Sequence, residues 1–244
     1  MSAEASLSPV FAVQRSSERA YFDHGWLKTY HSFSFAEYHD ANNLNWGALR
    51  VFNDDVVAGG SGFPAHPHRD MEIVTYVLSG RLAHRDSMGN HGIVGSGDVQ
   101  FMSAGTGVTH SEFNALPDEP LHLVQMWVLP GRLGRPPSYG QMEFGIDARR
   151  NRWLPMVSGE DRVQAPIRIT QRATLSVARL EGASVAHAFA PRRFGFLFVA
   201  DGTVGANGER LRRGDAVRLY DVADLAIEGD GELVLWDLPE VETV

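Results

Sequence analysis

The stretch GSGFPAHPHRDMEIVTYV, residues 60–77, places two histidines one residue apart directly before an apolar, strand-like run. His66 and His68 stand at positions i and i+2, and on an extended segment side chains with this spacing point to the same side of the chain. Both imidazoles can therefore reach one metal ion. A single pair of this kind is a weak indication, because histidines on a solvated loop acquire the same spacing by chance.

A second pair with the same spacing lies in the segment THSE, 109–112, where Glu112 follows His110 by two residues. Three imidazoles and one carboxylate form a nitrogen and oxygen ligand set that suits a divalent transition metal, with coordination positions left for water or substrate. Two same-face pairs, each beside a Gly-rich turn and an apolar strand, are more specific than either pair alone. We therefore predict one metal site with four ligands: His66, His68, His110 and Glu112.

The sequence offers a second carboxylate for this site. If the segment is extended, Glu72 has the same parity as the first histidine pair, so parity alone does not exclude it. However, Glu72 begins the apolar run IVTYVL and can instead pair with Arg69 or Arg85 as a group that supports a ligand. We favour Glu112 as the ligand, because it shares one face with its neighbouring histidine if both lie on one strand.

Nine of the ten histidines lie at or before His122, so any chemistry that histidines carry belongs to the first half of the chain. Surface or turn positions are expected for four of them: His24, His31, His39 and His91. A hydrogen-bonded core role, or one that supports a ligand, is preferred over a place in a pocket for two more: His84 and His122. His187, alone in the second half, is expected to be structural. Core or edge packing, rather than contact with a substrate, is expected for four aromatic residues: Tyr30, Phe33, Phe35 and Tyr38.

The composition argues against several other classes of protein. Of the 244 residues, 43% are hydrophobic and 21% are charged, which is ordinary globular usage. A formal charge of −8 argues against a nucleic-acid groove, which needs clustered Lys and Arg. There is no cysteine, so imidazole and carboxylate are the strong metal ligands available. No apolar run approaches the roughly 20 residues of a membrane span, and no signal-peptide pattern is visible, so we expect a cytoplasmic protein.

Short strand-like runs separated by turn residues fill most of the chain. They include 47–53, 71–78, 98–102 and 121–129 in the first half, and 174–181, 193–200, 215–220 and 232–238 in the second. Strands at this spacing predict an all-β sandwich or barrel, and two series predict two domains. The Pro- and Gly-rich stretch 128–145 separates the series, because both residue types interrupt strands. We expect an N-terminal metal-binding domain over 1–130, a crossover over 131–170 and a C-terminal domain over 171–244.

Two stretches of the first half resemble the sequence motifs of the cupin superfamily. From Gly60 the chain spells Gly-x5-His-x-His-x3-Glu, and from Gly97 it spells Gly-x5 followed by SAGTGVTHSEFN. The chain departs from the general pattern at two points: seven residues rather than six separate Glu72 from Gly80, and two extra residues precede His110. These departures resemble the pirin branch of the superfamily. HGWLKTYHSFSFAEYHD (24–40), LRVFNDD (49–55) and HRDSMGN (84–90) are also similar to pirin signature stretches.

The resemblance is dense over residues 12–130 and only architectural over 170–240. It implies a bicupin, in which two jelly-roll-like β-barrels face each other. The N-terminal barrel of pirins carries iron or another divalent metal, and the C-terminal barrel carries none. Carried over residue by residue, the ligands are His66, His68, His110 and Glu112, the same four that the spacing indicates. The second half has no HxH or HxE pair, which fits a barrel without a metal.

The resemblance to bacterial pirins implies quercetin 2,3-dioxygenase activity. In this reaction O2 opens the central ring of a flavonol and carbon monoxide is released, and Glu112 would be both a ligand and the acceptor of the substrate's hydroxyl proton. The expected partners are a small flavonol-like molecule and O2, without nucleic acid or membrane, and the expected state is a monomer. Two other functions stay open. Pirins of animal cells resemble transcriptional co-regulators whose partner-binding surface depends on the metal's oxidation state, and a metal-stabilised structural protein is the third alternative.

Overall fold

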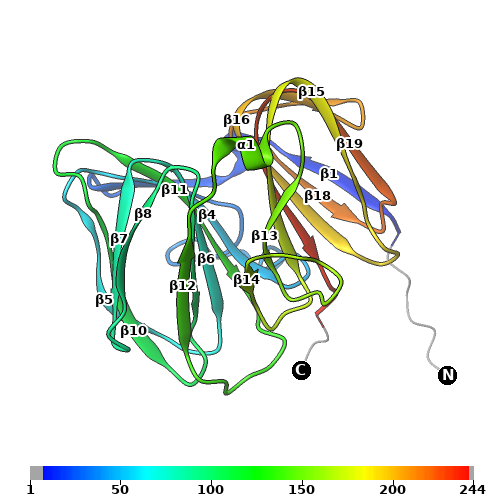
Figure 1. Cartoon of the computed structure of the whole chain (residues 1–244). Coiled ribbons are helices and arrows are strands. Elements are labelled where there is room, and N and C mark those ends of the chain that lie inside the picture. Colours follow the sequence, from blue (N-terminus) through cyan, green and yellow to red (C-terminus); the bar gives the residue numbers. More distant parts are fainter. Residues whose placement is uncertain (1–7, 242–244) are drawn as a thin grey trace.

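In this computed structural model residues 8–241 are described, and they form three β-sheets that follow one another from left to right in Figure 1. The first sheet has the order β5 (Gly62–His68), β10 (Val108–Asn114), β7 (Arg81–Asp86), β8 (His91–Gly95). The second has the order β12 (Ser138–Met142), β9 (Val99–Ser103), β6 (Glu72–Ser79), β11 (Leu121–Val128), β4 (Leu49–Val57), β3 (Leu27–His31), β2 (Ala20–Asp23). The third has the order β1 (Val10–Gln14), β18 (Ala216–Tyr220), β16 (Phe194–Ala206), β19 (Asp224–Leu238), β15 (Thr174–Ala188), β13 (Leu154–Ser158), β14 (Ile167–Arg168), and β17 (Glu209–Arg212) pairs with β16.

Helical structure is limited in the described part of the chain to a 3-10 turn, η1 (Ser16–Glu18), and one short helix, α1 (Ile146–Arg149). No helix there has the length and apolar character that crossing a membrane requires. The prediction of an all-β protein is therefore confirmed.

The first and second sheets face each other and enclose the interior of the N-terminal domain. The third sheet forms the C-terminal domain, where the long strands β15, β16 and β19 change register at bulges and surround a core of their own. The sheets are open at their edges, so each domain is jelly-roll-like rather than a closed barrel. The predicted arrangement of two such domains packed face to face is confirmed (Figure 1).

The third sheet also takes strands from outside residues 171–244. β1 pairs with β18, and β13 and β14 come from the stretch expected as a crossover. The predicted domain boundaries at residues 130 and 170 stay a proposal. Strand pairing in the third sheet joins segments from all three predicted parts: 1–130, 131–170 and 171–244.

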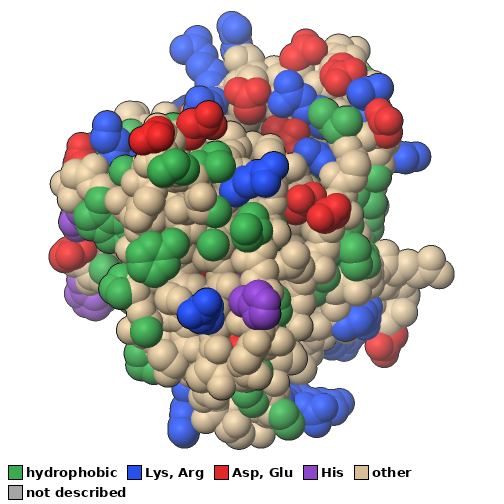
Figure 2. All heavy atoms as spheres, turned by 60° about the vertical axis from the view of Figure 1, so that its left-hand side comes forward, with side chains coloured by type: hydrophobic (Ala, Val, Ile, Leu, Met, Phe, Trp, Pro, Cys, Tyr) green, Lys and Arg blue, Asp and Glu red, His purple; other side chains and the backbone are tan. Residues whose placement is uncertain are grey.

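The outer side of the first sheet carries separate hydrophobic side chains rather than a broad apolar surface. Figure 2 shows this side of the molecule, where hydrophobic groups lie in small clusters between polar and charged ones. Ile93 on β8 and Phe113 on β10 are among the exposed members. The apolar contacts that hold the sheets together therefore lie inside the molecule.

A continuous apolar core joins the two domains through the second and third sheets. Phe52 of β4 packs against Phe196 and Phe198 of β16, with a distance of 4.9 Å between ring centroids in both pairs. All three rings are fully or almost fully buried. Removal of such surfaces from water is the main favourable contribution to folding, at roughly 25 cal/mol per Å². The second sheet is thus a wall of the N-terminal domain on one face and a packing surface for the C-terminal domain on the other.

We expect Phe196→Ala to lower the free energy of unfolding by about 3–5 kcal/mol, because the deletion leaves a cavity among closely packed rings. Phe196 is 0% exposed and also contacts Phe33 at 5.5 Å between centroids. Urea unfolding followed by tryptophan fluorescence measures the loss. Ile93→Ala, at a site that is 55% exposed, is the control and should change stability by less than about 0.5 kcal/mol. Equal effects of the two substitutions would show that the domains do not depend on this core.

Candidate metal centre

Three imidazoles meet where β5 and β10 pair in the first sheet. His66 lies directly opposite His110 in the antiparallel register, and His68 lies two residues along β5. The Nε2 atoms of His66 and His110 are 3.1 Å apart. One ring nitrogen from each of the three histidines lies within 4.8 Å of the others. The three histidines of the predicted ligand set therefore lie together in the structure.

Hydrogen bonding fixes which nitrogen of His66 faces this cluster. Its Nδ1 lies 2.7 Å from the carbonyl oxygen of Pro64. A carbonyl oxygen only accepts, so Nδ1 carries the proton and Nε2 presents a lone pair toward His110. Nδ1 of His110 is buried and has no partner within the described residues. Ring nitrogens that face each other, or that have no hydrogen-bond partner within the described residues, are an arrangement suited to a metal ion.

Burial favours the neutral form of two of these imidazoles. Burial, together with the neighbouring His110 and His66, lowers the pKa of His68 to about 4. Burial and the nearby His66 lower the pKa of His110 to about 3. Neutral imidazole is the form that binds metals. Nitrogen ligands lie about 2.0–2.1 Å from ions such as zinc, so ligand atoms around one ion stand roughly 3–3.5 Å apart, and the 3.1 Å between His66 and His110 fits this spacing. The donor set therefore fits a divalent metal.

Glu112 is held by two amide groups from the opposite sheet. Its Oε1 accepts a hydrogen bond of 2.6 Å from Nε2 of Gln100, and its Oε2 accepts one of 2.7 Å from Nε2 of Gln125. Trp127 Nε1 donates to Gln125 Oε1 at 3.2 Å, and the Tyr139 hydroxyl donates to Gln100 Oε1 at 3.4 Å. These donors orient both amides so that their NH2 groups face the carboxylate. The two amide donors therefore fix the position and orientation of this carboxylate beside the imidazoles.

The four predicted ligands lie in two overlapping groups. His66, His68 and His110 form one, and His84, His110 and Glu112 form the other, each with ligand atoms within 4.8 Å of one another. His110 belongs to both groups because β10 runs between β5 and β7 in the first sheet. A single ion bound by all four predicted residues stays a proposal.

Glu72 lies on the other face of the second sheet. Its carboxylate accepts hydrogen bonds from the backbone N and Oγ1 of Thr170, at 2.6 and 2.9 Å, and from the backbone N of Gln171 at 3.2 Å. The expected pairing with Arg69 or Arg85 is wrong. The parity argument did not apply, because a left-handed residue, Asp70 with φ of 45°, ends the extended segment before β6 begins.

Alternation along β6 explains where Glu72 points. Val74 and Tyr76 belong to the core between the domains, whereas Ile73 and Val77 belong to cores inside the N-terminal domain. Glu72 lies two residues before Val74 on the same strand, so its side chain is on the same face as those of Val74 and Tyr76 and is directed toward the C-terminal domain. Burial on both faces is also the reason why this strand is a continuous apolar run in the sequence.

The other histidines separate into exposed and paired ones. The surface positions expected for His24, His39 and His91 are confirmed. The expectation for His31 is wrong: it is 3% exposed, since it lies on the inner face of β3 and its ring contacts Phe22 and Phe35. The predicted hydrogen-bonded roles are present in two cases, each with an aspartate: His84 with Asp86 at 3.2 Å and His122 with Asp54 at 2.7 Å. His187, expected to be structural, also pairs with an aspartate, Asp237, at 3.1 Å.

Aromatic rings border the partly exposed side of the imidazole cluster. The ring of Trp127 meets that of His68 edge to face, with 4.8 Å between centroids, and Phe35 meets Trp127 in the same way at 5.3 Å. Packing in the core is confirmed for Phe33, which is fully buried. Phe35, expected to pack only in the core or at an edge, also extends this aromatic border.

Comparison with known proteins identifies a cupin-type family for each of the two domains. Residues 11–128 match the family model described as Pirin, and residues 156–238 match that of the Quercetinase C-terminal cupin domain. A pirin-like protein of Caulobacter vibrioides is 45% identical over 219 residues, which cover 88% of this chain and 94% of the relative. The chain belongs to the pirin family.

Two further relatives link pirins to an activity and to a metal. The quercetin 2,3-dioxygenase of Escherichia coli strain K12 is 41% identical over 232 residues, which cover 94% of this chain and 99% of that protein. The crystal structure of the bacterial pirin YhhW from Escherichia coli in complex with nickel(II) matches with a TM-score of 0.88 and 38% identity, covering 95% of this chain and 100% of that one. The predicted bicupin fold is confirmed by these matches.

Sequence reasoning missed the two glutamines of this pirin that hold Glu112. Gln100 is the polar residue in the strand DVQFM, and Gln125 is the one in LHLVQMWVL. A polar side chain in the middle of an otherwise apolar strand was the available signal, because buried polar groups need a partner. The identity of that partner depends on how strands from distant parts of the chain face each other.

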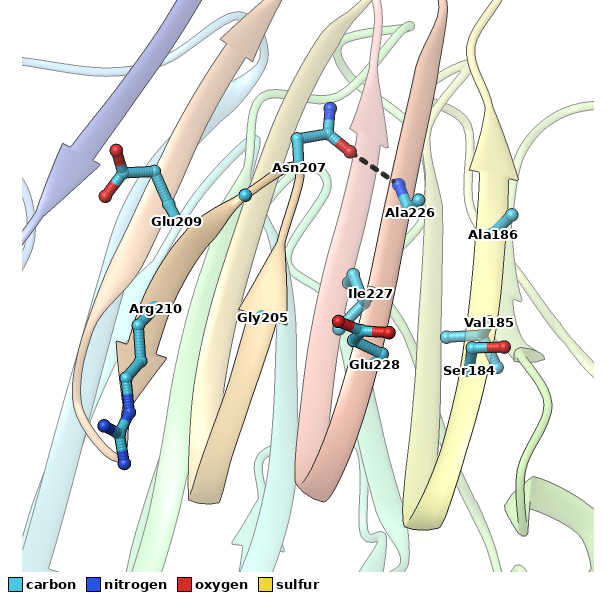
Figure 3. A pocket seen from close by; sticks show the side chains of 11 residues that line it. Ser184, Val185, Ala186, Gly205, Asn207, Glu209, Arg210, Ala226, Ile227 and Glu228 are labelled. Carbon is cyan, nitrogen blue, oxygen red and sulfur yellow. Dashed lines mark hydrogen bonds between the residues drawn. The ribbon is translucent and has the colours of Figure 1, made fainter.

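Within its described residues, the C-terminal domain of this pirin shows no comparable cluster. Both groups of His and Glu side chains that suit a metal ion lie in the N-terminal domain. A depression of about 490 Å³ lies over β15, β16 and β19 (Figure 3). Its charged side chains stand apart rather than converging: Glu209 and Arg210 on β17, and Glu228 on β19. The Asn207 side chain, just after β16, accepts a hydrogen bond of 2.8 Å from the backbone N of Ala226 on β19. This bond joins two of the segments that border the depression. The depression contains no imidazole.

Asp55, on β4, is expected to give the stability of this pirin a characteristic pH dependence. Burial raises the pKa of this 3% exposed carboxyl from 3.8 to about 7. Between about pH 4 and pH 7 the folded chain keeps a proton that the unfolded chain has released, so the free energy of unfolding falls as pH rises, by at most about 1.4 kcal/mol per pH unit. Asp55→Asn should remove this fall.

Urea unfolding of the metal-free natural protein and Asp55→Asn at pH 5, 6 and 7 measures the effect. Buried histidines with lowered pKa, such as His31, give the opposite slope, but they are common to both proteins and cancel in the difference. Stability curves that run parallel from pH 5 to pH 7 would show that Asp55 titrates normally.

Proposed function

We propose that the chain is a metal-dependent dioxygenase that opens the heterocyclic ring of a flavonol such as quercetin with O2 and releases carbon monoxide. The observation that carries this proposal is the Glu112 carboxylate, fixed between the amides of Gln100 and Gln125 beside a cluster of imidazoles. The names of the related proteins, among them quercetin 2,3-dioxygenases, support the same substrate class.

We propose one divalent transition metal, iron, as the cofactor, with His66, His68, His110 and Glu112 as ligands. When bound, such an ion supplies positive charge that acidifies a coordinated hydroxyl and a redox centre for reaction with O2. The nickel(II) complex of a related pirin supports a divalent ion in this family.

The chain's own groups then have separate tasks. Glu112 accepts the proton of the flavonol hydroxyl, and its two amide partners hold the carboxylate in one orientation for that transfer. Trp127 and Phe35 offer ring faces and edges against which a flat aromatic substrate can pack. The buried side of the site, where His110 and Glu112 are each 2% exposed, limits the access of water to the reacting groups.

Oxygen uptake and carbon monoxide release with quercetin test this proposal directly. The protein is freed of metal and reloaded in parallel with iron, nickel, cobalt or manganese, and each form is measured against metal in buffer alone. One carbon monoxide per O2 consumed is expected with at least one metal. A metal-loaded protein that consumes no O2 with any flavonol of a panel would contradict the proposal, and partner capture that depends on the metal's oxidation state would then favour the binding-module alternative.

We also propose that the protein acts in the cytoplasm as a monomer and binds no nucleic acid. A formal charge of −8 and the absence of cysteine support these assignments. Gel filtration and a binding assay with duplex DNA at low salt test them.

A further inference from the structure

A second polar site lies between the two domains, away from the metal centre. A cleft of about 410 Å³ is bordered by Tyr76 and His122 of the second sheet, Arg149 of α1, and Arg179 and Glu232 of the third sheet. Side chains alternate between the two faces of a strand. On β6 Tyr76 therefore points away from its neighbour Val77, and on β11 His122 points away from Leu121 and Leu123, all three of which belong to a core inside the N-terminal domain. The cleft and the metal centre therefore lie on opposite faces of the second sheet. Its volume is that of a site for a small molecule.

The floor of the cleft holds a guanidinium group in a fixed position. Arg149 is 6% exposed. Its Nε donates to Glu232 at 2.9 Å and its Nη1 donates to the carbonyl of Phe144 at 3.1 Å. The Tyr76 hydroxyl donates to the same carboxylate. Gly97 packs so closely that a Cβ atom at this position would lie 2.4 Å from Arg149 Nη2. Rotamer freedom of the arginine is therefore already lost before any ligand binds.

One edge of this guanidinium is still available. Arg149 Nη2 has no hydrogen-bond partner within the described residues, and it is not among their buried polar atoms that lack one, so it remains in contact with the solvent of the cleft. A guanidinium that is held on two sides and open on the third is a preorganised donor for an oxyanion.

Arg213 lies at the mouth of the cleft and faces an imidazole rather than an acid. Its Nη2 donates to Nδ1 of His122 at 3.4 Å, while Nε2 of His122 donates to Asp54 at 2.7 Å. In this chain of contacts the group nearest to Arg213 is a ring nitrogen rather than a carboxylate, and within the described residues Arg213 has no ion pair. Arg179 pairs with Asp201 and Glu232 only through Nη1, at 3.3 and 3.7 Å. Three guanidinium groups and two carboxylates line the cleft, so its charge is positive in a chain whose formal charge is −8.

We propose that this cleft binds a small molecule through an oxyanion, a carboxylate or a phosphate group, with Arg149, Arg179 and Arg213 as the donors. The guanidinium fork matches both kinds of oxyanion. The assignment depends only on the charges and contacts of the cleft and is independent of the dioxygenase proposal.

Thermal unfolding of the metal-free protein tests the proposal with inorganic phosphate and with acetate, each against sodium chloride at equal ionic strength. Metal-free protein is used so that neither anion can bind at the metal centre. Phosphate or acetate several-fold above its Kd is expected to raise Tm by about 2–4 °C. Arg213→Ala and Arg179→Ala should lose this rise. Arg212→Ala, which removes an exposed neighbouring arginine outside the cleft, is the matched control and should keep it.

The two anions distinguish the source of the oxyanion. A rise with phosphate alone assigns the cleft to a phosphate group, and a rise with acetate alone assigns it to a carboxylate. A rise that persists unchanged in both cleft variants, or no rise with either anion beyond that of chloride, would overturn the proposal. Titration calorimetry of the natural protein and Arg213→Ala with the active anion provides a second readout that does not depend on stability.

Discussion

A His66→Ala/His68→Ala variant is expected to lose its metal, whereas the natural protein is expected to hold about one divalent ion per chain. Removal of two of the proposed four ligands leaves one imidazole and one carboxylate, and loss of even a group that only supports a ligand weakens metal binding about 10–100-fold. We therefore expect at least a 100-fold fall in affinity and no measurable flavonol turnover. The fold should persist, because both side chains lie at the partly exposed side of the first sheet.

Elemental analysis after dialysis, followed by competition with a chromophoric chelator, measures this loss. His24→Ala/His39→Ala is the matched control, since it removes two exposed histidines from the same domain and should leave metal content unchanged. Equal metal in the His66/His68 variant and the natural protein would place the ion elsewhere in the chain.

The second large effect distinguishes the two carboxylates. In Glu112→Gln the negative charge is lost and an NH2 group replaces one of the two oxygens that accept hydrogen bonds from Gln100 and Gln125, so donor faces donor. We expect metal affinity to fall about 10–100-fold and flavonol turnover to fall about 10²–10⁴-fold, the range associated with loss of a general base.

Glu72→Gln is the matched substitution and should leave metal content and turnover close to natural levels. Its cost is in stability, by about 1–3 kcal/mol, because the buried side chain accepts hydrogen bonds from Thr170 and Gln171 between the domains. Metal titration, oxygen uptake and urea unfolding of the two variants give the three quantities. If Glu72→Gln loses metal while Glu112→Gln retains metal and full turnover, the assignment of Glu112 is wrong.

The part of the site that local spacing controls could be predicted from the sequence. His110 and Glu112 do lie on one strand, so a period of two residues placed both inside the domain. The same rule failed for Glu72, since a single left-handed residue, Asp70, changes the direction of the chain between His68 and Glu72. The alternation rule applies only to residues of one continuous strand. The sequence did not show that this strand ends at His68, before Glu72.

The fold class and its two-domain character were also predictable, because alternating runs and turn residues are local features. Contacts between distant strands were not. Gln125 meets Glu112 only because two sheets face each other, and β1 joins a sheet built mostly from the other end of the chain. His31 was expected at the surface because nothing near it in the sequence marks the inner face of β3. Each of these positions depends on register between segments that are far apart.

The place of β1 in the third sheet has a consequence for how the protein folds during its synthesis. β1 ends at Gln14, and its partner β18 begins at Ala216. At ribosomal rates of about 5–20 residues per second, the strand VFAVQ leaves the ribosome roughly 10–40 s before the partner that pairs with it exists. The N-terminal domain has all of its own strands long before then and can fold first, while β1 waits as an unpaired apolar segment. A strand that is made early is thus placed late, and for that interval its unpaired backbone groups are open to chaperones or neighbouring chains.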